Sequence, residues 1–210
     1  TLKKSDGSRS HLFAKFNKDF SSQDFSSNLE INYQHVPNDT YFKVHDIDTA
    51  LVDKNKNIIT NDISYEFQND NSYLGISAAM YEDLTASDSD KTRFQYTVPD
   101  ILYERNLFTG NNIGTVDVKS NAFVKNYKVN QTTKFWINDV NWQSNPFVSL
   151  NGIQNKIRGL FKVVNYEAEG AETYKTEGLN SEVSGAISYE ADLPLSKKNG
   201  AKNRINYLNP

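Results

Sequence analysis

The chain has no cysteine, one methionine and no apolar run of the ~20 residues that a membrane-spanning helix needs. The absence of cysteine excludes disulfides, thiolate catalysis and cysteine-based metal sites. The net charge is only −3, and no long stripe of lysine and arginine is present. We therefore expect neither nucleic acid nor membrane insertion among its interactions. No segment of normal helix length shows the apolar period of 3.6 residues, so we expect strands.

Short segments of alternating apolar and polar residues, rich in tyrosine and phenylalanine, run through most of the chain. The clearest is residues 94–98, and we expect Pro99 to end that strand because proline has no amide hydrogen to donate. A break over residues 100–112 and a second alternating run over 113–118 follow. About a dozen such runs, roughly eight to twelve residues apart, predict an all-β fold with an immunoglobulin-like, Greek-key β-sandwich architecture.

The predicted organisation has three parts. Residues 1–10 are polar and form a disordered lead-in, and residues 11–166 form the β-sandwich domain. Residues 167–210 begin with an acidic, glycine-containing linker, continue with additional strand structure and end in a frayed tail.

Four segments resemble, in order, the N2-type domains of Gram-positive cell-wall adhesins of the MSCRAMM group, which are variants of the immunoglobulin fold. They are NDTYF (38–42), VDKNKNII (52–59), FQYTVPDIL (94–102) and the stretch that begins FTG (108–118). The resemblance implies an adhesion module for a host or matrix ligand, held on a wall-anchored stalk. It also implies a secreted or cell-wall-attached, extracellular location.

Aromatic and amide side chains are densest between Trp136 and Phe147. Exposed aromatic rings flanked by amides suit the capture of a glycan or peptide, so we predict ligand-binding roles for Trp142, Asn145 and Phe147. The alternative is that the rings fill the core, and we expect Trp136 there and Trp142 to be the more exposed of the two.

The resemblance also implies a possible covalent cross-link. Adhesin domains of this type sometimes join a lysine on the first strand to an asparagine on the last, beside a buried acid. Lys15 or Lys18 and Asn165 are the candidates here, with Glu30 or Asp48 as the acid. The alternative is that these are ordinary surface residues.

No motif indicates a catalytic or metal centre. His11, His35 and His45 lack the spacing of metal ligands, and no Ser-His-Asp arrangement is recognisable. We predict no cofactor, although the aspartates of residues 46–53 and 88–90 could hold an incidental Ca²⁺.

These observations favour a non-catalytic extracellular binding module that captures a host or matrix protein or glycan, and addition of a strand to a sheet edge is one way it could do so. A secreted carbohydrate-active enzyme or carbohydrate-binding module is one alternative. A structural stalk or surface-layer domain is the other.

Overall fold

The computed structural model describes residues 11–37, 41, 51, 56–86, 93–126, 131–150, 152–170, 178–193, 195–199 and 204–208. All of its secondary-structure elements in these ranges are strands, so the prediction of an all-β fold is confirmed. The proposed lead-in, His45, the aspartates of 46–53 and 88–90, and the segment 38–40 lie outside the described residues.

Twelve strands follow one another along the chain. They are β1 (Leu12–Ser21), β2 (Ser26–His35), β3 (Ile58–Gln68), β4 (Ser72–Asp83), β5 (Phe94–Gly110), β6 (Gly114–Asn126), β7 (Thr132–Gln143), β8 (Phe147–Val148), β9 (Gln154–Glu169), β10 (Leu179–Asp192), β11 (Leu195–Asn199) and β12 (Arg204–Leu208).

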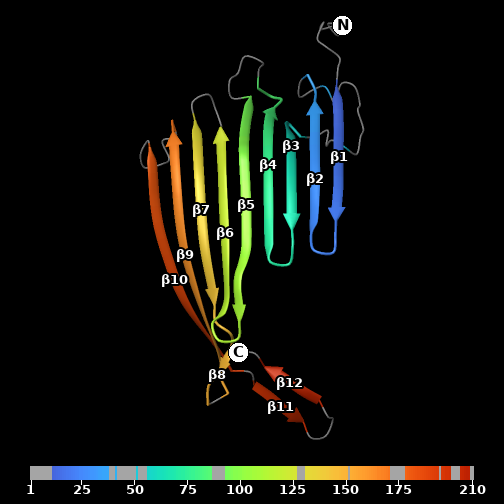
Figure 1. Ribbon diagram of the computed structural model, residues 1–210. Helices are drawn as coiled ribbons and strands as arrows, with labels where there is room; N and C mark the ends of the chain where they lie inside the picture. Colours follow the sequence, from blue (N-terminus) through green and yellow to red (C-terminus); the bar gives the residue numbers. More distant parts are fainter. Residues whose placement is uncertain are drawn as a thin grey trace.

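Ten of these strands form one antiparallel sheet in the order β1-β2-β3-β4-β5-β6-β7-β9-β10, with β8 paired to the end of β9 (Figure 1). Apart from β8, each strand lies beside the next strand in sequence, which is a meander. Within the described residues no strand returns to lie beside an earlier one as a Greek key requires. β11 and β12 pair only with each other. The strand order therefore establishes an antiparallel all-β fold and does not show a Greek-key sandwich.

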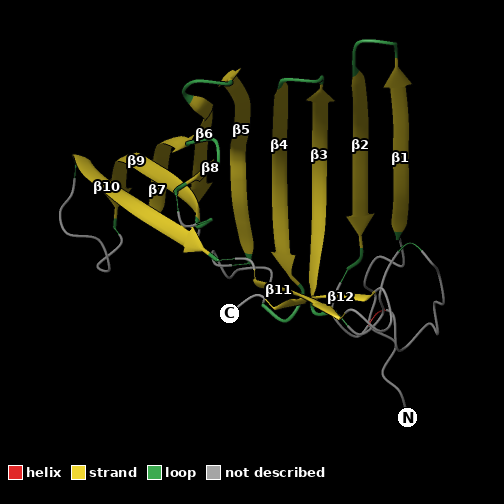
Figure 2. Cartoon of the chain, turned by 90° about the horizontal axis from the view of Figure 1, so that it is seen from below, coloured by secondary structure: helices red, strands yellow, loops and turns green. Residues whose placement is uncertain are grey.

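The sheet is a single curved layer, as Figure 2 shows from below. Side chains of a strand alternate between the two faces, and directly paired residues share a face. Following the register across the sheet assigns one face that is mostly apolar. The apolar face carries Phe16, Phe20, Leu29, Ile31, Ile63, Tyr65, Ile76, Met80, Ile101, Tyr103, Val116, Val118, Trp136, Val140, Phe161, Val163, Val183 and Ile187.

The opposite face is polar and is tied together by ion pairs and amide hydrogen bonds. Lys15 Nζ lies 2.9 Å from Glu30 Oε1, and Lys119 Nζ lies 2.7 Å from Glu104 Oε1. The polar face carries Lys15, Asn17, Glu30, Asn32, Asp62, Ser64, Ser77, Glu104, Lys119, Asp139, Lys162 and Ser184.

The main buried cluster lies at one end of the sheet rather than on either face. Val36, Tyr41, Ile59 and Leu84 are buried together there, with Phe13 packed against them. Elsewhere most large apolar side chains of the apolar face are exposed or half-buried, because no described element covers them.

Two predicted boundaries differ from the structure. β5 does not end at Pro99 but runs to Gly110, because the register shifts between Thr97 and Asp100. Proline is tolerated at such a bulge, where its missing amide hydrogen interrupts no ladder bond. The expected domain boundary at 166–167 falls inside β9, and β10 belongs to the same sheet.

Candidate functional site

A shallow groove of ≈ 600 Å³ lies on the apolar face across β7, β9 and β10. Gly159 and Gly185 leave its floor without side chains, and the ring of Trp142 forms one wall. A Cβ atom at position 159 would lie 3.4 Å from Cε3 of Trp142, so the indole packs directly over this glycine. The remaining lining residues are Val140, Leu160, Phe161, Ala186 and Ile187. An occupant of this groove would contact almost only hydrocarbon.

The indole nitrogens on the apolar face donate hydrogen bonds within the protein. The indole nitrogen of Trp136 donates to Ser120 Oγ at 3.0 Å, and Ser120 Oγ lies 2.8 Å from Asn138 Oδ1. The indole nitrogen of Trp142 donates to the carbonyl oxygen of Ile113 at 2.8 Å. The donors of both tryptophans are thus satisfied within the protein, which lowers the cost of placing this face in an apolar environment.

The predicted binding residues take different roles. Trp142 lines the groove and is half-buried, whereas Trp136 is 55% exposed. The expectation that Trp136 would be the core residue and Trp142 the exposed one is therefore wrong, because no element among the described residues covers β7. Phe147 is exposed on β8. Asn145 donates to the carbonyl oxygens of Gly110 and Asn111 at 2.9 and 2.8 Å, so its amide fixes the β5–β6 turn.

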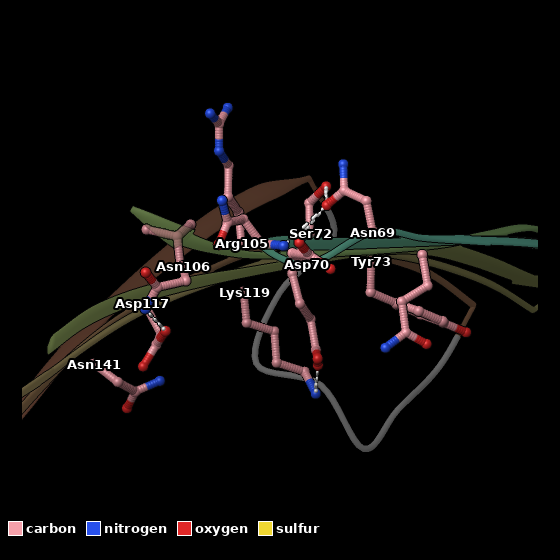
Figure 3. Close-up of a pocket in the computed structure, with 13 residues that line it drawn as sticks. Asn69, Asp70, Ser72, Tyr73, Arg105, Asn106, Asp117, Lys119 and Asn141 are labelled. Carbon is pink, nitrogen blue, oxygen red and sulfur yellow. Dashed lines mark hydrogen bonds and ion pairs between the residues drawn. The ribbon is translucent and has the colours of Figure 1, made fainter. Parts of the chain in front are cut away.

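A second depression, of ≈ 360 Å³, opens near the other end of the sheet from the buried cluster and is lined by polar side chains (Figure 3). The β3–β4 turn forms one side, where Asn69 Oδ1 accepts hydrogen bonds from Ser72 N at 2.8 Å and Ser72 Oγ at 2.9 Å. Asn106 Nδ2 donates to Asp117 Oδ1 at 2.8 Å on the other side. Figure 3 shows Arg105 pointing to the opposite side of the sheet from Lys119.

A row of alternating charges begins at this depression, with Glu104 and Lys119, and continues across four strands. Glu104, Lys119, Asp139 and Lys162 are successive cross-strand partners on β5, β6, β7 and β9. Asp139 Oδ1 accepts no hydrogen bond but lies 3.3 Å from Lys162 Nζ, so the row is held together by charge. Each acidic side chain has a basic neighbour, and the row leaves no concentrated charge for a ligand.

Tyr73 borders the same depression. Burial raises the pKa of its hydroxyl above the ordinary value of 10.0, and the hydrogen bond to Glu66 and the negative charges of Glu66 and Glu104 raise it further. The ring lies over Gly75, where a Cβ atom would be 2.9 Å from the hydroxyl oxygen. Tyr73 is therefore held as a neutral donor and is not activated as a nucleophile.

An ion pair buried near the Val36–Leu84 cluster was not expected from the sequence. Arg93 Nε and Nη2 lie 2.8 and 2.5 Å from Glu82 Oε1, and both side chains are nearly inaccessible. Residues 82–90 are acidic and rich in serine, which is typical of a surface loop, yet Glu82 lies in β4 and is 5% exposed. The local sequence did not reveal this ion pair, because an acidic stretch has the same pattern whether or not an arginine elsewhere in the chain packs against it.

The structure does not bring the cross-link candidates together. Lys15 and Lys18 lie on β1 and Asn165 lies on β9, with β2 to β7 between them. At about 4.8 Å per strand interval this separation is roughly 34 Å. Lys15 is instead paired with Glu30, so these residues form no isopeptide bond in this arrangement. Asp48 lies outside the described residues.

Within the described part of the chain, no three or more His, Asp or Glu side chains gather as a metal site. His11 Nδ1 lies 3.1 Å from the hydroxyl of Tyr41. Among the same residues, no helix is long and apolar enough to cross a membrane.

No family model matches the chain, and none of the curated proteins compared with it is similar.

Proposed function

We propose that this chain is a non-catalytic amphipathic sheet whose apolar face packs against the hydrocarbon of lipid. One observation carries this proposal: apolar side chains predominate on one face of all nine main strands, and the described residues leave them uncovered. The charged exceptions on this face include Lys18, Arg105 and the ion-paired Lys134 and Glu167. The polar face, with its ion pairs, suits contact with water.

The extent of the apolar face favours a continuous apolar environment over a small ligand. Nine strands have eight intervals of about 4.8 Å, and their average length of about thirteen residues at 3.3 Å rise gives a face of roughly 1,600 Å². Proteins in water rarely expose an apolar patch of more than a few hundred Å².

The sequence did not predict lipid contact because it contains no long apolar run. In a strand only every second residue points to a given face, so a sheet can present an apolar face with no such run. The strands are also long: β3 has 11 residues and β4 has 12. About 9–11 residues of a tilted strand cross the hydrocarbon of a bilayer.

The two tryptophans of the chain provide a direct test, because both lie on the apolar face. Vesicles of a phosphatidylcholine with brominated acyl chains should quench the fluorescence of Trp136 and Trp142, whereas vesicles of the unbrominated lipid should not.

A matched variant tests whether the polar face contacts lipid. Replacing both tryptophans by Phe and changing Phe135→Trp moves the only indole to the polar face, where Phe135 stacks on Phe123 with ring centroids 5.1 Å apart. This variant should be quenched much less. Equal quenching of both proteins, or of neither, would contradict the proposal.

A second candidate is the extracellular adhesin module, in which a second sheet covers the apolar face and completes an immunoglobulin-like sandwich. The exposure of Phe147 and the place of Trp142 in the groove support a binding role at this end. Here the location is secreted or cell-wall-attached, and the ligand is a host or matrix protein or a glycan. A glycan and matrix-protein array with the purified chain tests it. Binding that is lost in Phe147→Ala and Trp142→Ala, without lipid quenching, would favour the adhesin over the lipid-facing sheet.

A further inference from the structure

The outer edge of β10 is open. β10 pairs with β9 along its whole length, and no described strand pairs with its other edge. Nearly all of its side chains are exposed. β11 and β12 lie below the sheet, on the side away from this edge (Figures 1 and 2). An open edge presents unpaired backbone donors and acceptors, so it is a template for another strand.

The two edges of the sheet differ in how well they resist such pairing. β1 carries Lys15 and Lys18 near its middle, and charged edge residues, lysine above all, disfavour the approach of a second strand. β10 contains no lysine, arginine or proline, and its centre is the small-residue stretch Ser184, Gly185 and Ala186. β10 is therefore the edge that accepts a partner.

We propose that β10 pairs antiparallel with β10 of a second copy of this chain, with Gly185 opposite its own counterpart. A two-fold axis perpendicular to the sheet relates the copies, so their apolar faces lie on the same side. This register places Val183 opposite Ile187 of the second copy on the apolar face. These side chains are 64% and 84% exposed in the single chain, and both gain an apolar neighbour.

The charges of β10 select the same register. Centred on Gly185, the pairing sets Glu182 opposite a serine, Ser188, and Glu190 opposite an amide, Asn180. A centre at Ala186 would set Glu182 opposite Glu190, and like charges in direct opposition are destabilising. A centre at Ser184 would set Val183 opposite Gly185 and lose the apolar pair. Glu190 also keeps its ion pair with Arg158, at 2.9 Å.

The absence of cysteine makes the register measurable. We would prepare the full-length Val183→Cys and Ile187→Cys variants and oxidise them separately and as a mixture, in buffer and in a nonionic detergent. The mixture should give a disulfide-linked heterodimer, because directly opposed residues have Cα atoms within disulfide reach. Each variant alone should give little dimer, because its two cysteines would lie about four residues apart, roughly 13 Å.

The opposite results overturn the inference. Equal cross-linking of the single variants, or none in the mixture, would exclude this register. Adding Ser184→Lys to both variants should abolish the heterodimer, whereas Ser21→Lys on β1 should leave it unchanged; circular dichroism confirms that each variant is folded. If Ser184→Lys leaves the cross-link intact, the contact does not run through the β10 edge. The inference does not depend on lipid contact, since the buffer arm tests it without lipid or detergent.

Discussion

Gly114, at the start of β6, is the most constrained glycine of the described chain. Its φ of +94° lies in the region that other residues rarely adopt, and a Cβ atom would lie 2.0 Å from the carbonyl oxygen of Gln143. Gly152 also has a positive φ, of +79°, but no atom lies within 4 Å of its added Cβ. Substitutions at the two positions can therefore be compared to separate the cost of backbone strain from the cost of steric overlap.

We expect Gly114→Ala to destabilise the fold well beyond the ~1–2 kcal/mol of left-handed backbone strain, because it also forces β6 and β7 apart. Gly152→Ala, with strain alone, should cost about 1–2 kcal/mol. Urea unfolding followed by circular dichroism measures both. Equal losses in the two variants would show that the overlap with Gln143 is relieved without cost.

Two aspartates give opposite dependences of stability on pH. Burial raises the pKa of Asp62, with a smaller contribution from the charge of Glu30. Hydrogen bonds from the side chain and backbone of Thr85 lower the pKa of Asp83, and Thr85 Oγ1 lies 2.6 Å from its Oδ1. A raised carboxyl pKa favours the folded state only while the group is protonated, whereas a lowered one favours it when the group is ionised.

Asp62→Asn should therefore make the protein more stable than the wild type at neutral pH. The difference should disappear below the unfolded pKa of about 3.8 and grow as the pH rises through the raised folded pKa. Asp83→Asn should be less stable than the wild type above 3.8, with the difference lost as the pH falls through the lowered folded pKa. Urea midpoints from acidic to neutral pH measure both. The same sign of change in the two variants would contradict these assignments.

At the scale of strands, the charge row on β5, β6, β7 and β9 shows how the polar face is stabilised. Lys119 has an acidic partner on each side, Glu104 and Asp139, whereas Lys15 on the edge strand β1 faces only the β2 side, where Glu30 is its ion-pair partner. The side chains of the Lys119–Glu104 pair are about half exposed, so solvent screens their interaction.

Lys119→Glu should destabilise the sheet by about 1 kcal/mol, since it places three acidic side chains in a row. Lys15→Glu, which removes an ion pair with a single acid, Glu30, should cost less. Thermal unfolding at low salt and at about 1 M salt tests the cause, because the penalty should shrink when charges are screened. A penalty that does not change with salt would indicate lost packing of the lysine stem instead.

At the scale of the whole molecule, the two faces of the sheet predict different responses to the same new charge. Ile63 lies on the apolar face and its neighbour Ser64 on the polar face. Lysine at the centre of a bilayer costs about 2–4 kcal/mol, so Ile63→Lys should strongly weaken association with phosphatidylcholine vesicles. Ser64→Lys should associate like the wild type. Vesicle flotation measures both, and an equal effect of the two changes would contradict a lipid-facing side.

The sequence by itself determined the strands and many of their ends. Alternation located the start of β5 and the first half of β6, because a strand's period of two is a local property. The polar residues 69–72 are typical of a turn, and Asn69 N donates to Ser72 O at 2.9 Å where they join β3 to β4. The alternating pattern also specified that one face of each strand would be apolar.

Only the tertiary structure decided how the strands are ordered and what their apolar faces meet. Pairing partners depend on contacts between distant residues, and the same alternation suits a sandwich or a single open meander. The register therefore placed Lys15 far from Asn165, exposed Trp136 and buried Glu82 against Arg93, none of which a local pattern encodes.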